Sequence, residues 1–271
     1  MGIEVFNRHE KKFFLSGEQY KAIKEVLLKY MEPDKHNVDG KFYTICNIYY
    51  DTEDDNVIRT SISKPLYKEK LRLRGYGVPG LQDKIYLEIK KKFNKFVNKR
   101  RTPFLLREAY DFLDNKGVKE LLPHMNGQVI KEIQHFLEMN EVYPKVYLAY
   151  DRRAYFGKDD PDLRVSFDNN IRTRRDELRL ELGDHGRQLL EDPDYWLMEI
   201  KIINAMPLWL SRALGDLNIY PRSFSKYGTE YLQFVKRSIE STEGETKWIN
   251  SQRFSRNPRL EVPNISRRLA Q

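Results

Sequence analysis

Arginine, lysine and glutamate alternate with apolar residues in several short runs of this 271-residue chain. KLRLRGYG carries Lys70, Arg72 and Arg74 at alternate positions, and KIYLEIKKKF carries Glu88 and Lys90 in the same way. In an extended strand, alternate side chains share a face, so each run has one charged face and one mainly apolar face. Arginine and lysine bind phosphate oxygens, and a glutamate carboxylate is a ligand for Mg²⁺ or Mn²⁺. The pattern therefore suits a phosphate chain with a divalent cation.

Three further runs show the same alternation. HEKKFFL places Glu10 with Lys12, LRVSFD places Arg164 opposite its apolar residues, and LMEIKII places Glu199 with Lys201. For any single strand, an antiparallel sheet with one face in solvent explains this pattern. Over five strands, however, arginine and lysine recur where threonine, serine and tyrosine are usual. If helices cover the apolar side, the charged face can line a closed barrel, where so many cations require an anionic ligand.

The alternating runs predict about eight strands, and short Gly/Pro/Asn/Asp turns such as GVPG (77–80) favour antiparallel pairing. The expected strands cover about residues 8–15, 42–51, 67–77, 84–93, 144–155, 162–168, 171–182 and 195–203. Helix starts are predicted at Ser16 with Gln19, at Thr102-Pro103, at Asn126 and at Pro207, and GTEYLQFVKRSIE forms one further amphipathic helix.

These elements predict an α+β fold, a closed antiparallel β-barrel tunnel of about eight strands with helices packed outside. We expect residues 1–242 to form this domain. Residues 243–271 form a basic C-terminal tail with two prolines and no sustained periodicity. We expect this tail to wrap the surface or to be partly disordered.

Composition excludes several classes of protein. The chain has 48 Lys+Arg against 40 Asp+Glu, a net charge of +8, and 40% hydrophobic residues, enough for a core and against global disorder. No run approaches the roughly 20 apolar residues of a spanning helix, and the N-terminus lacks the apolar core of a secretory signal. A single cysteine, Cys46, allows no internal disulfide. We therefore expect a cytoplasmic protein without a membrane span.

Two other motifs have competing interpretations. GYGVPG matches the dinucleotide pattern G-x-G-x-x-G, but a strand follows it where such a site requires a helix, so we predict a hairpin turn. The run KKKFNKFVNKRR is a candidate nucleic-acid patch because two phenylalanines interrupt its basic residues. We instead expect Lys90 to point inward, with Lys99, Arg100 and Arg101 at the tunnel rim, where they attract anionic chains.

Nine motifs, in order, resemble the polyphosphate polymerase (VTC) domain of the triphosphate tunnel metalloenzymes. They are RHEKKF (8–13), IYYDT (48–52), KLRLRGYG (70–77), IYLEIKKK (85–92), KRR (99–101), LAYDRRAY (148–155), LRVSFDNNIRTR (163–174), LMEIK (197–201) and SFSKYG (223–228). The resemblance implies a tunnel of about eight antiparallel strands that binds triphosphate. It also implies transfer of the γ-phosphoryl group of ATP onto a growing polyphosphate chain.

The resemblance further implies roles for individual residues. The phosphate-binding, catalytic set comprises Lys12, Arg72, Arg74, Lys90, Arg152, Arg164, Lys201 and Lys226. The metal ligand is Glu199, with Glu10 and Glu88 as further candidates, and the cofactor is Mn²⁺ or Mg²⁺. Further substrate contacts are expected from Arg222 and Ser225 near the tunnel mouth and from Lys99, Arg100 and Arg101 at the rim.

The chain departs from the wider superfamily at two places. Many tunnel hydrolases begin with Glu-x-Glu-x-Lys, but Arg8 stands at the first position here, which weakens the hydrolase interpretation. Ser223 occupies a position where some polymerases carry lysine, with Arg222 as its substitute. A tripolyphosphatase or nucleoside triphosphatase, a non-catalytic polyphosphate-binding module and a nucleic-acid-binding protein remain alternatives. The expected partners are ATP and polyphosphate, without nucleic acid, and any coupling to a membrane would need a separate membrane protein.

Overall fold

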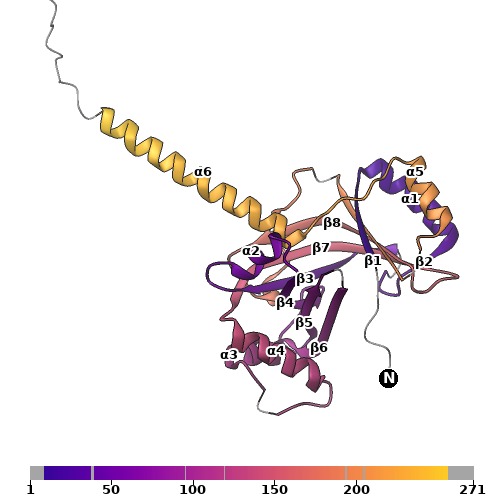
Figure 1. Cartoon of the computed structure of the whole chain (residues 1–271), viewed down its shortest axis with the longest axis horizontal. Helices are drawn as coiled ribbons and strands as arrows, with labels where there is room; N and C mark the ends of the chain where they lie inside the picture. The colour runs from indigo at the N-terminus through magenta and orange to yellow at the C-terminus, as the bar shows by residue number, and fades with distance from the viewer. Residues whose placement is uncertain are drawn as a thin grey trace, which may run out of the picture. The chain divides into compact units, whose positions relative to one another are not determined.

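The structure, a computed structural model, describes residues 9–37, 40–94, 96–118, 120–192, 194–203 and 205–255. The chain divides into two compact units, residues 1–230 and residues 231–271. In the second unit, helix α6 continues to Ser255, and Lys236 lies 3.8 Å from Glu240 one turn further along. All other elements belong to the first unit (Figure 1).

The elements follow one another along the chain as helices inserted between strands. They are β1 (His9–Leu15), α1 (Gly17–Tyr30), β2 (Met31–Pro33), β3 (Tyr43–Asp51), α2 (Asn56–Ile62), β4 (Tyr67–Tyr76), β5 (Lys84–Phe93), β6 (Phe96–Leu105), α3 (Leu106–Asn115), α4 (Gly127–Met139), β7 (Tyr143–Gly157), β8 (Arg164–Arg174), the 3-10 turn η2 (Leu180–Leu182), β9 (Arg187–Gln188), β10 (Trp196–Ile202), α5 (Leu208–Asp216) and α6 (Lys226–Ser255).

The strands form one large antiparallel sheet, which confirms the predicted α+β class. Its order is β1-β10-β8-β7-β3-β4-β5-β6, with β2 added to β7 and β9 to β8. Register shifts at Tyr49/Tyr50 and Ala149/Asp151 mark bulges, which bend a sheet. Lys12 of β1 and Lys70 of β4 interact electrostatically, although their strands are far apart in the sheet order.

The expected closed barrel is not formed by hydrogen bonds, because β1 and β6 remain the two edges of the strand path within the described residues. A neighbouring segment explains why. Pro221 forms a bridge with Phe13, and the Arg222 amide donates to the Lys12 carbonyl at 2.7 Å. The chain leading into α6 therefore lies along the free edge of β1, which a closing strand would need.

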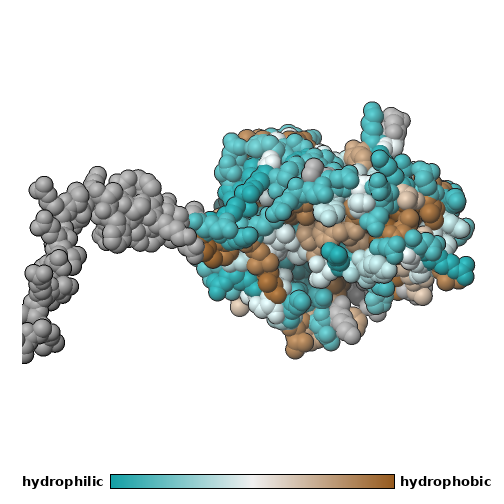
Figure 2. Space-filling view, turned by 90° about the horizontal axis from the view of Figure 1, so that it is seen from above, coloured by the Kyte–Doolittle hydropathy of each residue, from teal (hydrophilic) through white to brown (hydrophobic). Residues whose placement is uncertain are grey.

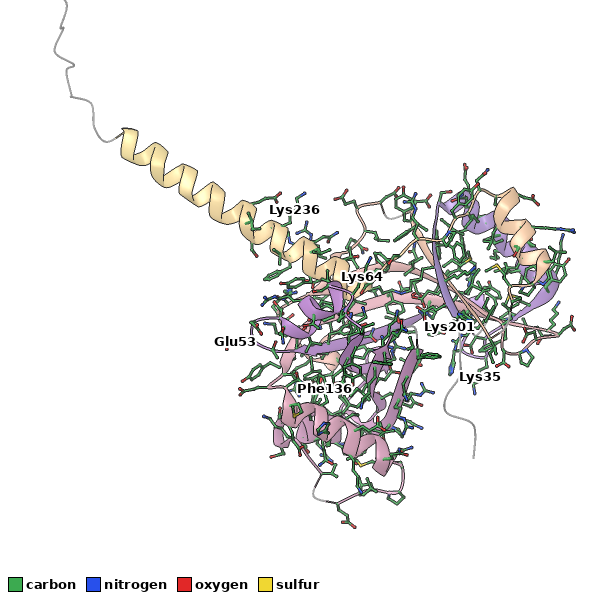
Figure 3. The ribbon with its side chains drawn as sticks, viewed as in Figure 1. Lys35, Glu53, Lys64, Phe136, Lys201 and Lys236 are labelled. Carbon is green, nitrogen blue, oxygen red and sulfur yellow. The ribbon has the colours of Figure 1, made fainter. Side chains whose placement is uncertain are left out.

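Two apolar clusters cover the other face of the sheet. Helices α3 and α4 pack on β3, β4, β5 and β7, around fully buried residues such as Leu73, Leu87 and Phe112. Phe136 of α4 belongs to the same cluster (Figure 3). Helices α1 and α5 pack on β1, β8 and β10. The described surface is mainly hydrophilic in the view of Figure 2, with apolar side chains in separate patches. The helices thus cover the apolar faces of the strands, and the charged faces of the strands lie together on the opposite side of the sheet.

Most predicted elements are confirmed, and α1 shows why. Ser16 Oγ accepts from the Gln19 amide at 3.2 Å, and the Gln19 side chain accepts from the Ser16 amide at 3.0 Å. This capping box satisfies amides that the first helical turn leaves free. The helix ends at Tyr30, where β2 begins. The GVPG segment is a turn between β4 and β5, as predicted, with Gly77 at φ +75°.

The helix predicted to begin at Thr102-Pro103 is wrong at its start. Both residues lie in β6, and the helix begins at Leu106. Thr102 is fully buried, and its hydroxyl accepts from the Asn126 amide at the start of α4 at 2.8 Å. Pro103 is tolerated because β6 is an edge strand, where proline removes no essential ladder donor. Strand β6 itself was not predicted.

One other prediction at the level of elements needs correction. The strands expected at 162–168 and 171–182 are one strand, β8, which ends at Arg174 before a turn with Glu177 at φ +45°. The tail expected from residue 243 continues α6 as helix to Ser255, and residues 256–271 lie outside the described residues. The short strands β2 and β9 were also missed.

Candidate functional site

The predicted phosphate-binding residues from the strands lie on one face of the sheet, which we call the charged face. The register sets Lys12 opposite Glu199, Lys201 opposite Arg164, and Arg72 opposite Glu88. Apart from the exposed Lys11, their neighbours along each strand are buried on the helix-covered side. The charged face comprises Glu10, Lys12, Asn47, Tyr49, Lys68, Lys70, Arg72, Arg74, Tyr86, Glu88, Lys90, Lys92, Lys99, Arg101, Tyr150, Arg152, Arg164, Ser166, Asp168, Glu199 and Lys201.

Glu199 is one centre of this face. Its carboxylate lies 3.6 Å from the Lys12 ammonium, 3.5 Å from Lys226 and 3.5 Å from the Arg152 guanidinium. Burial would raise the pKa of Glu199, but Lys226, Lys12 and Arg152 hold it well below its ordinary value. Lys226 is the first residue of α6, and its ammonium lies beside carboxylates of β8 and β10. Glu199 is ionised at neutral pH.

Asp168 was not among the predicted site residues, yet it organises the same region. Arg152 binds it through two nitrogens, at 2.6 and 2.7 Å, and the Lys226 ammonium lies 2.5 Å from its Oδ2. Burial opposes ionisation, but these two cations lower the pKa of Asp168. Its alternation with Arg164 along β8 was the available sequence signal. Asp168 fixes the direction of two phosphate-binding candidates.

Glu88 is the second carboxylate centre, on β5. Arg72 lies 2.6 Å away, Lys99 2.8 Å and Arg74 3.8 Å. Burial would raise the pKa of Glu88, but the positive charges of Arg72, Arg74 and Lys99 lower it well below its ordinary value. Glu88 therefore neutralises and orients cations of β4 and β6, three of which lie within 4 Å of it.

Two tyrosines and an asparagine orient the arginine pair of β4. Arg72 donates to Tyr49 Oη at 3.2 Å, and Arg74 donates to Asn47 Oδ1 at 2.9 Å and Tyr150 Oη at 3.2 Å. Burial opposes ionisation of Tyr49, but Arg72, Arg74 and Lys70 lower its pKa to about 8. These residues were missed as site residues because their positions on β3 and β7 face the arginines only after the strands pair.

The other predicted cations of β4, β5, β8 and β10 show how crowded the face is. Burial, with help from Lys90, lowers the pKa of Lys70 to about 8. Burial also lowers the pKa of Lys201 to about 8. Lys90 lies in register with Lys70, while Arg164 lies 3.1 Å from Asp34. Without a ligand, the face therefore disfavours part of its own positive charge.

The residues predicted to contact substrate at the tunnel rim and mouth do not all lie on the charged face. Lys99 and Arg101 lie on the charged face, with Arg101 4.4 Å from the Tyr86 ring centre. Arg100 lies on the other face, paired with Glu132 of α4 at 3.1 Å, which does not favour the predicted substrate contact. The Arg222 side chain is exposed, and the Ser225 hydroxyl accepts from the Gly228 amide at 3.1 Å.

A divalent cation can be tested against the carboxylates of this face. Glu10 and Glu199 approach the same Lys12 ammonium at 3.4 and 3.6 Å. Within the described residues, no group of three or more His, Cys, Asp or Glu side chains could form a metal cage. Mg²⁺ usually takes one or two carboxylates and completes its shell with substrate phosphates and water, so Glu199 with Glu10 fits this mode. Glu88 has three cations around it, as Glu199 has, but among the described residues no second carboxylate shares one of its cations, so it fits this mode less well.

The VTC domain family matches residues 7–235, most of the chain. The chain belongs to the VTC domain family. It is 24% identical over 212 residues to the vacuolar transporter chaperone complex subunit 4 of Schizosaccharomyces pombe, a match that covers 70% of this chain and 29% of that protein. The chain thus spans less than a third of the curated relative that it matches.

Solved structures with similar chain traces share little sequence with this VTC domain. A putative adenylate cyclase from Vibrio parahaemolyticus has a TM-score of 0.48 at 12% identity, covering 84% of this chain and 99% of its own. A putative adenylate cyclase from Bacillus halodurans has 0.49 at 12%, covering 83% and 96%. A putative adenylyl cyclase from Hippeastrum, described as having a dominant triphosphatase activity, has 0.48 at 14%, covering 80% and 92%. Within the described residues, no helix is long and apolar enough to cross a membrane.

Proposed function

We propose that this VTC domain is a metal-dependent polyphosphate polymerase that transfers the γ-phosphoryl group of ATP onto a growing polyphosphate chain. The convergence of Lys12, Arg152 and Lys226 on Glu199, on the same face as Arg72 and Arg74, is the observation that carries the proposal. Such a lining has the chemistry to bind a linear phosphate chain, because arginine forks and lysine ammonium groups complement successive phosphate oxygens.

The residues of the chain account for the main requirements of phosphoryl transfer. The reaction depends on in-line positioning and on neutralising charge on the transferred group, with little covalent chemistry for the protein. Arg72 and Arg74 are held in place by Tyr49, Asn47 and Tyr150 before any ligand arrives. Such pre-orientation avoids reorganisation during the reaction. The acceptor phosphate is already anionic at neutral pH, so no general base is required.

A divalent cation fits beside Glu199 and Glu10. When bound, Mn²⁺ or Mg²⁺ would supply charge neutralisation and orientation to the phosphate oxygens. Lys12 lies between these two carboxylates and would be shared by the phosphate chain. In the absence of ligands, its ammonium donates to the Phe224 carbonyl at 3.0 Å.

The setting in the cell is also a proposal. The named relative is a subunit of a vacuolar transporter chaperone complex. By analogy, we infer that this domain acts in the cytoplasm beside a separate membrane protein that receives the product.

The test is to incubate the full chain with γ-labelled ATP and Mn²⁺ and to separate labelled long-chain polyphosphate from free phosphate. We expect labelled chains from the native protein and none from Glu199→Gln. Glu132→Gln, which changes a carboxylate on the opposite face, is the matched control and should retain chain synthesis. Release of phosphate without chain growth, lost in Glu199→Gln, would replace the proposal with a triphosphatase. Tight polyphosphate binding with neither product would indicate a binding module.

A further inference from the structure

Five lysines gather at one end of the charged face. Lys68 lies opposite Lys92, and Lys70 lies opposite Lys90, in the register of β4 and β5. Lys64 follows α2 in the turn that leads to β4 (Figure 3). Lys68 feels the positive charges of Lys92, Lys90 and Lys64, which shows that the group is close in space. We call Lys64, Lys68, Lys70, Lys90 and Lys92 the lysine array.

The lysine array lacks the carboxylates that accompany cations elsewhere on the face. Lys12 and Lys226 lie near Glu199, and Lys99 near Glu88, all within 4 Å. Among the described residues, no ion pair joins an array lysine to a carboxylate. The Lys68 ammonium instead donates to the Ser61 carbonyl at 2.8 Å, and Lys70 lies 5.7 Å from the Tyr227 ring centre. Within the described ranges, no carboxylate therefore lies within 4 Å of an array ammonium, and Lys90 acts on Glu10 of β1 only at longer range.

Such an arrangement is unfavourable without an anion. Like charges directly opposite each other on neighbouring strands destabilise a sheet. Burial lowers the pKa of Lys68, and the charges of Lys92, Lys90 and Lys64 lower it further. A sheet face that only met solvent would gain nothing from two such pairs in succession. An anion lying along the two strands would neutralise both.

The array continues the line of the arginine pair. Lys68, Lys70, Arg72 and Arg74 share one face of β4, and six residues of strand span about 20 Å. A triphosphate held at Arg72 and Arg74 is too short to extend to Lys68. A longer phosphate chain that follows β4 passes Lys70 and reaches Lys68 and Lys92. Chain length therefore decides which ligand uses the array.

We propose that the lysine array is a binding subsite for the polymeric phosphate chain beyond the reacting phosphates, and not for the nucleotide. This assignment rests on the proposed function, since it takes the linear polyphosphate to be the ligand of the charged face. It separates two ligand classes along one strand: the triphosphate is held at Arg72 and Arg74, and the polymer extends over the array.

The experiment measures the affinity of the full chain for tripolyphosphate and for long-chain polyphosphate by calorimetry. The variant is Lys68→Gln with Lys92→Gln, and a second variant, Lys64→Gln with Lys92→Gln, spares the contact to Ser61. The control, Lys21→Gln with Lys131→Gln, removes the same charge from α1 and α4. We expect both array variants to lose roughly tenfold in polymer affinity, with a salt slope about 1.4 lower for two lost contacts. Tripolyphosphate affinity should change less than about twofold.

Other results have distinct meanings. An equal loss for both ligands would overturn the subsite assignment, and so would an equal loss in the control, which would indicate net charge alone. Unchanged polymer affinity in both array variants would also overturn the assignment, because the lysine charges would then be screened by bulk ions alone. A loss for oligodeoxythymidylate, without a loss for polyphosphate, would assign the array to nucleic acid. If the native chain binds neither phosphate ligand, the proposed function itself fails.

Discussion

At the scale of single residues, the charged face is held in place partly by one carboxylate, Asp168, and by tyrosines that were not predicted as site residues. Asp168 contacts Arg152 and Lys226, and Tyr49 contacts Arg72. A buried cation needs such partners, because removing one leaves an uncompensated charge at a cost of several kcal/mol. These partners thus keep the buried arginine and lysine side chains charged and in position before an anion binds.

Lys70 and Tyr49 on the charged face both titrate near pH 8, so anion binding should depend on pH. Burial lowers the pKa of Lys70 to about 8, and the charge of Arg72 lowers that of Tyr49 to about 8 in spite of burial. Raising the pH through 8 therefore removes the positive charge of Lys70, as it does that of Lys201, and adds the negative charge of Tyr49. Anion binding favours the protonated forms, so affinity should fall by up to about tenfold per pH unit for each linked proton. The groups facing Lys70 are Tyr49 on β3, Tyr227 on α6, Lys90 on β5, Lys12 on β1 and Lys68 on β4.

Calorimetry with tripolyphosphate at pH 7 and pH 9 provides the measurement. Lys70→Arg and Tyr49→Phe should each lose less affinity between these values than the native chain, since neither new side chain titrates there. Comparing variants removes the titration of the ligand, which is common to all. An identical pH dependence in all three proteins would contradict this assignment.

At the scale of elements, helices on the apolar side position the strands that carry the site. Helix α1 follows β1 and covers the back of Lys12 and Glu199 with Tyr20, Ile23 and Leu27. Its capping box lies outside the charged face. Helix stability and phosphate binding can therefore be changed separately.

Replacement of the cap tests this separation. Ser16→Ala should lower the free energy of unfolding by about 1 kcal/mol, because the Gln19 amide loses its acceptor. Urea unfolding measures this change, and Ser16→Asp, which keeps an acceptor, is the control. Tripolyphosphate affinity of the folded variants should equal that of the native chain. If the Ser16→Ala variant were as stable as the Ser16→Asp variant, the side chain at position 16 would not stabilise the helix as a cap.

Element boundaries also show where sequence reasoning was limited. Arg100 was grouped with Lys99 and Arg101 because β6 was not recognised as a strand. Once β6 is paired with β5, the period of two puts Arg100 on the side of α4 and the other two on the charged face. The helix expected at Pro103 obscured the strand, since proline fits both a first helical turn and an edge strand.

At the scale of the whole molecule, curvature of the sheet turns separate charged strand faces into one site. Lys12 and Lys70 come from strands far apart in the sheet order and still interact. A ligand that fills this face neutralises charges that the fold alone leaves in conflict. Its binding energy should therefore appear as stability of the folded chain.

Thermal unfolding tests the charged face as a unit. Tripolyphosphate at 100 times its dissociation constant should stabilise the chain by about 2.7 kcal/mol, or roughly 5–10 °C. Arg72→Gln with Arg74→Gln should abolish the shift, whatever its effect on the starting temperature. Arg100→Gln with Arg107→Gln, on the side of the sheet covered by α3 and α4, should preserve it. A retained shift in the Arg72/Arg74 variant would contradict the role of the inward arginines.

The sequence alone determined which side chains share a face, because the period of two is a property of the extended backbone and is independent of strand partners. It therefore placed Lys12, Arg72 and Glu199 on the charged faces of their strands without a structure. Only the tertiary structure decided which faces meet. Lys226 reaches Asp168 across 58 residues of sequence, and the segment at Pro221 lies along β1 so that the sheet remains open. Such contacts depend on packing between distant segments, which a local pattern does not encode.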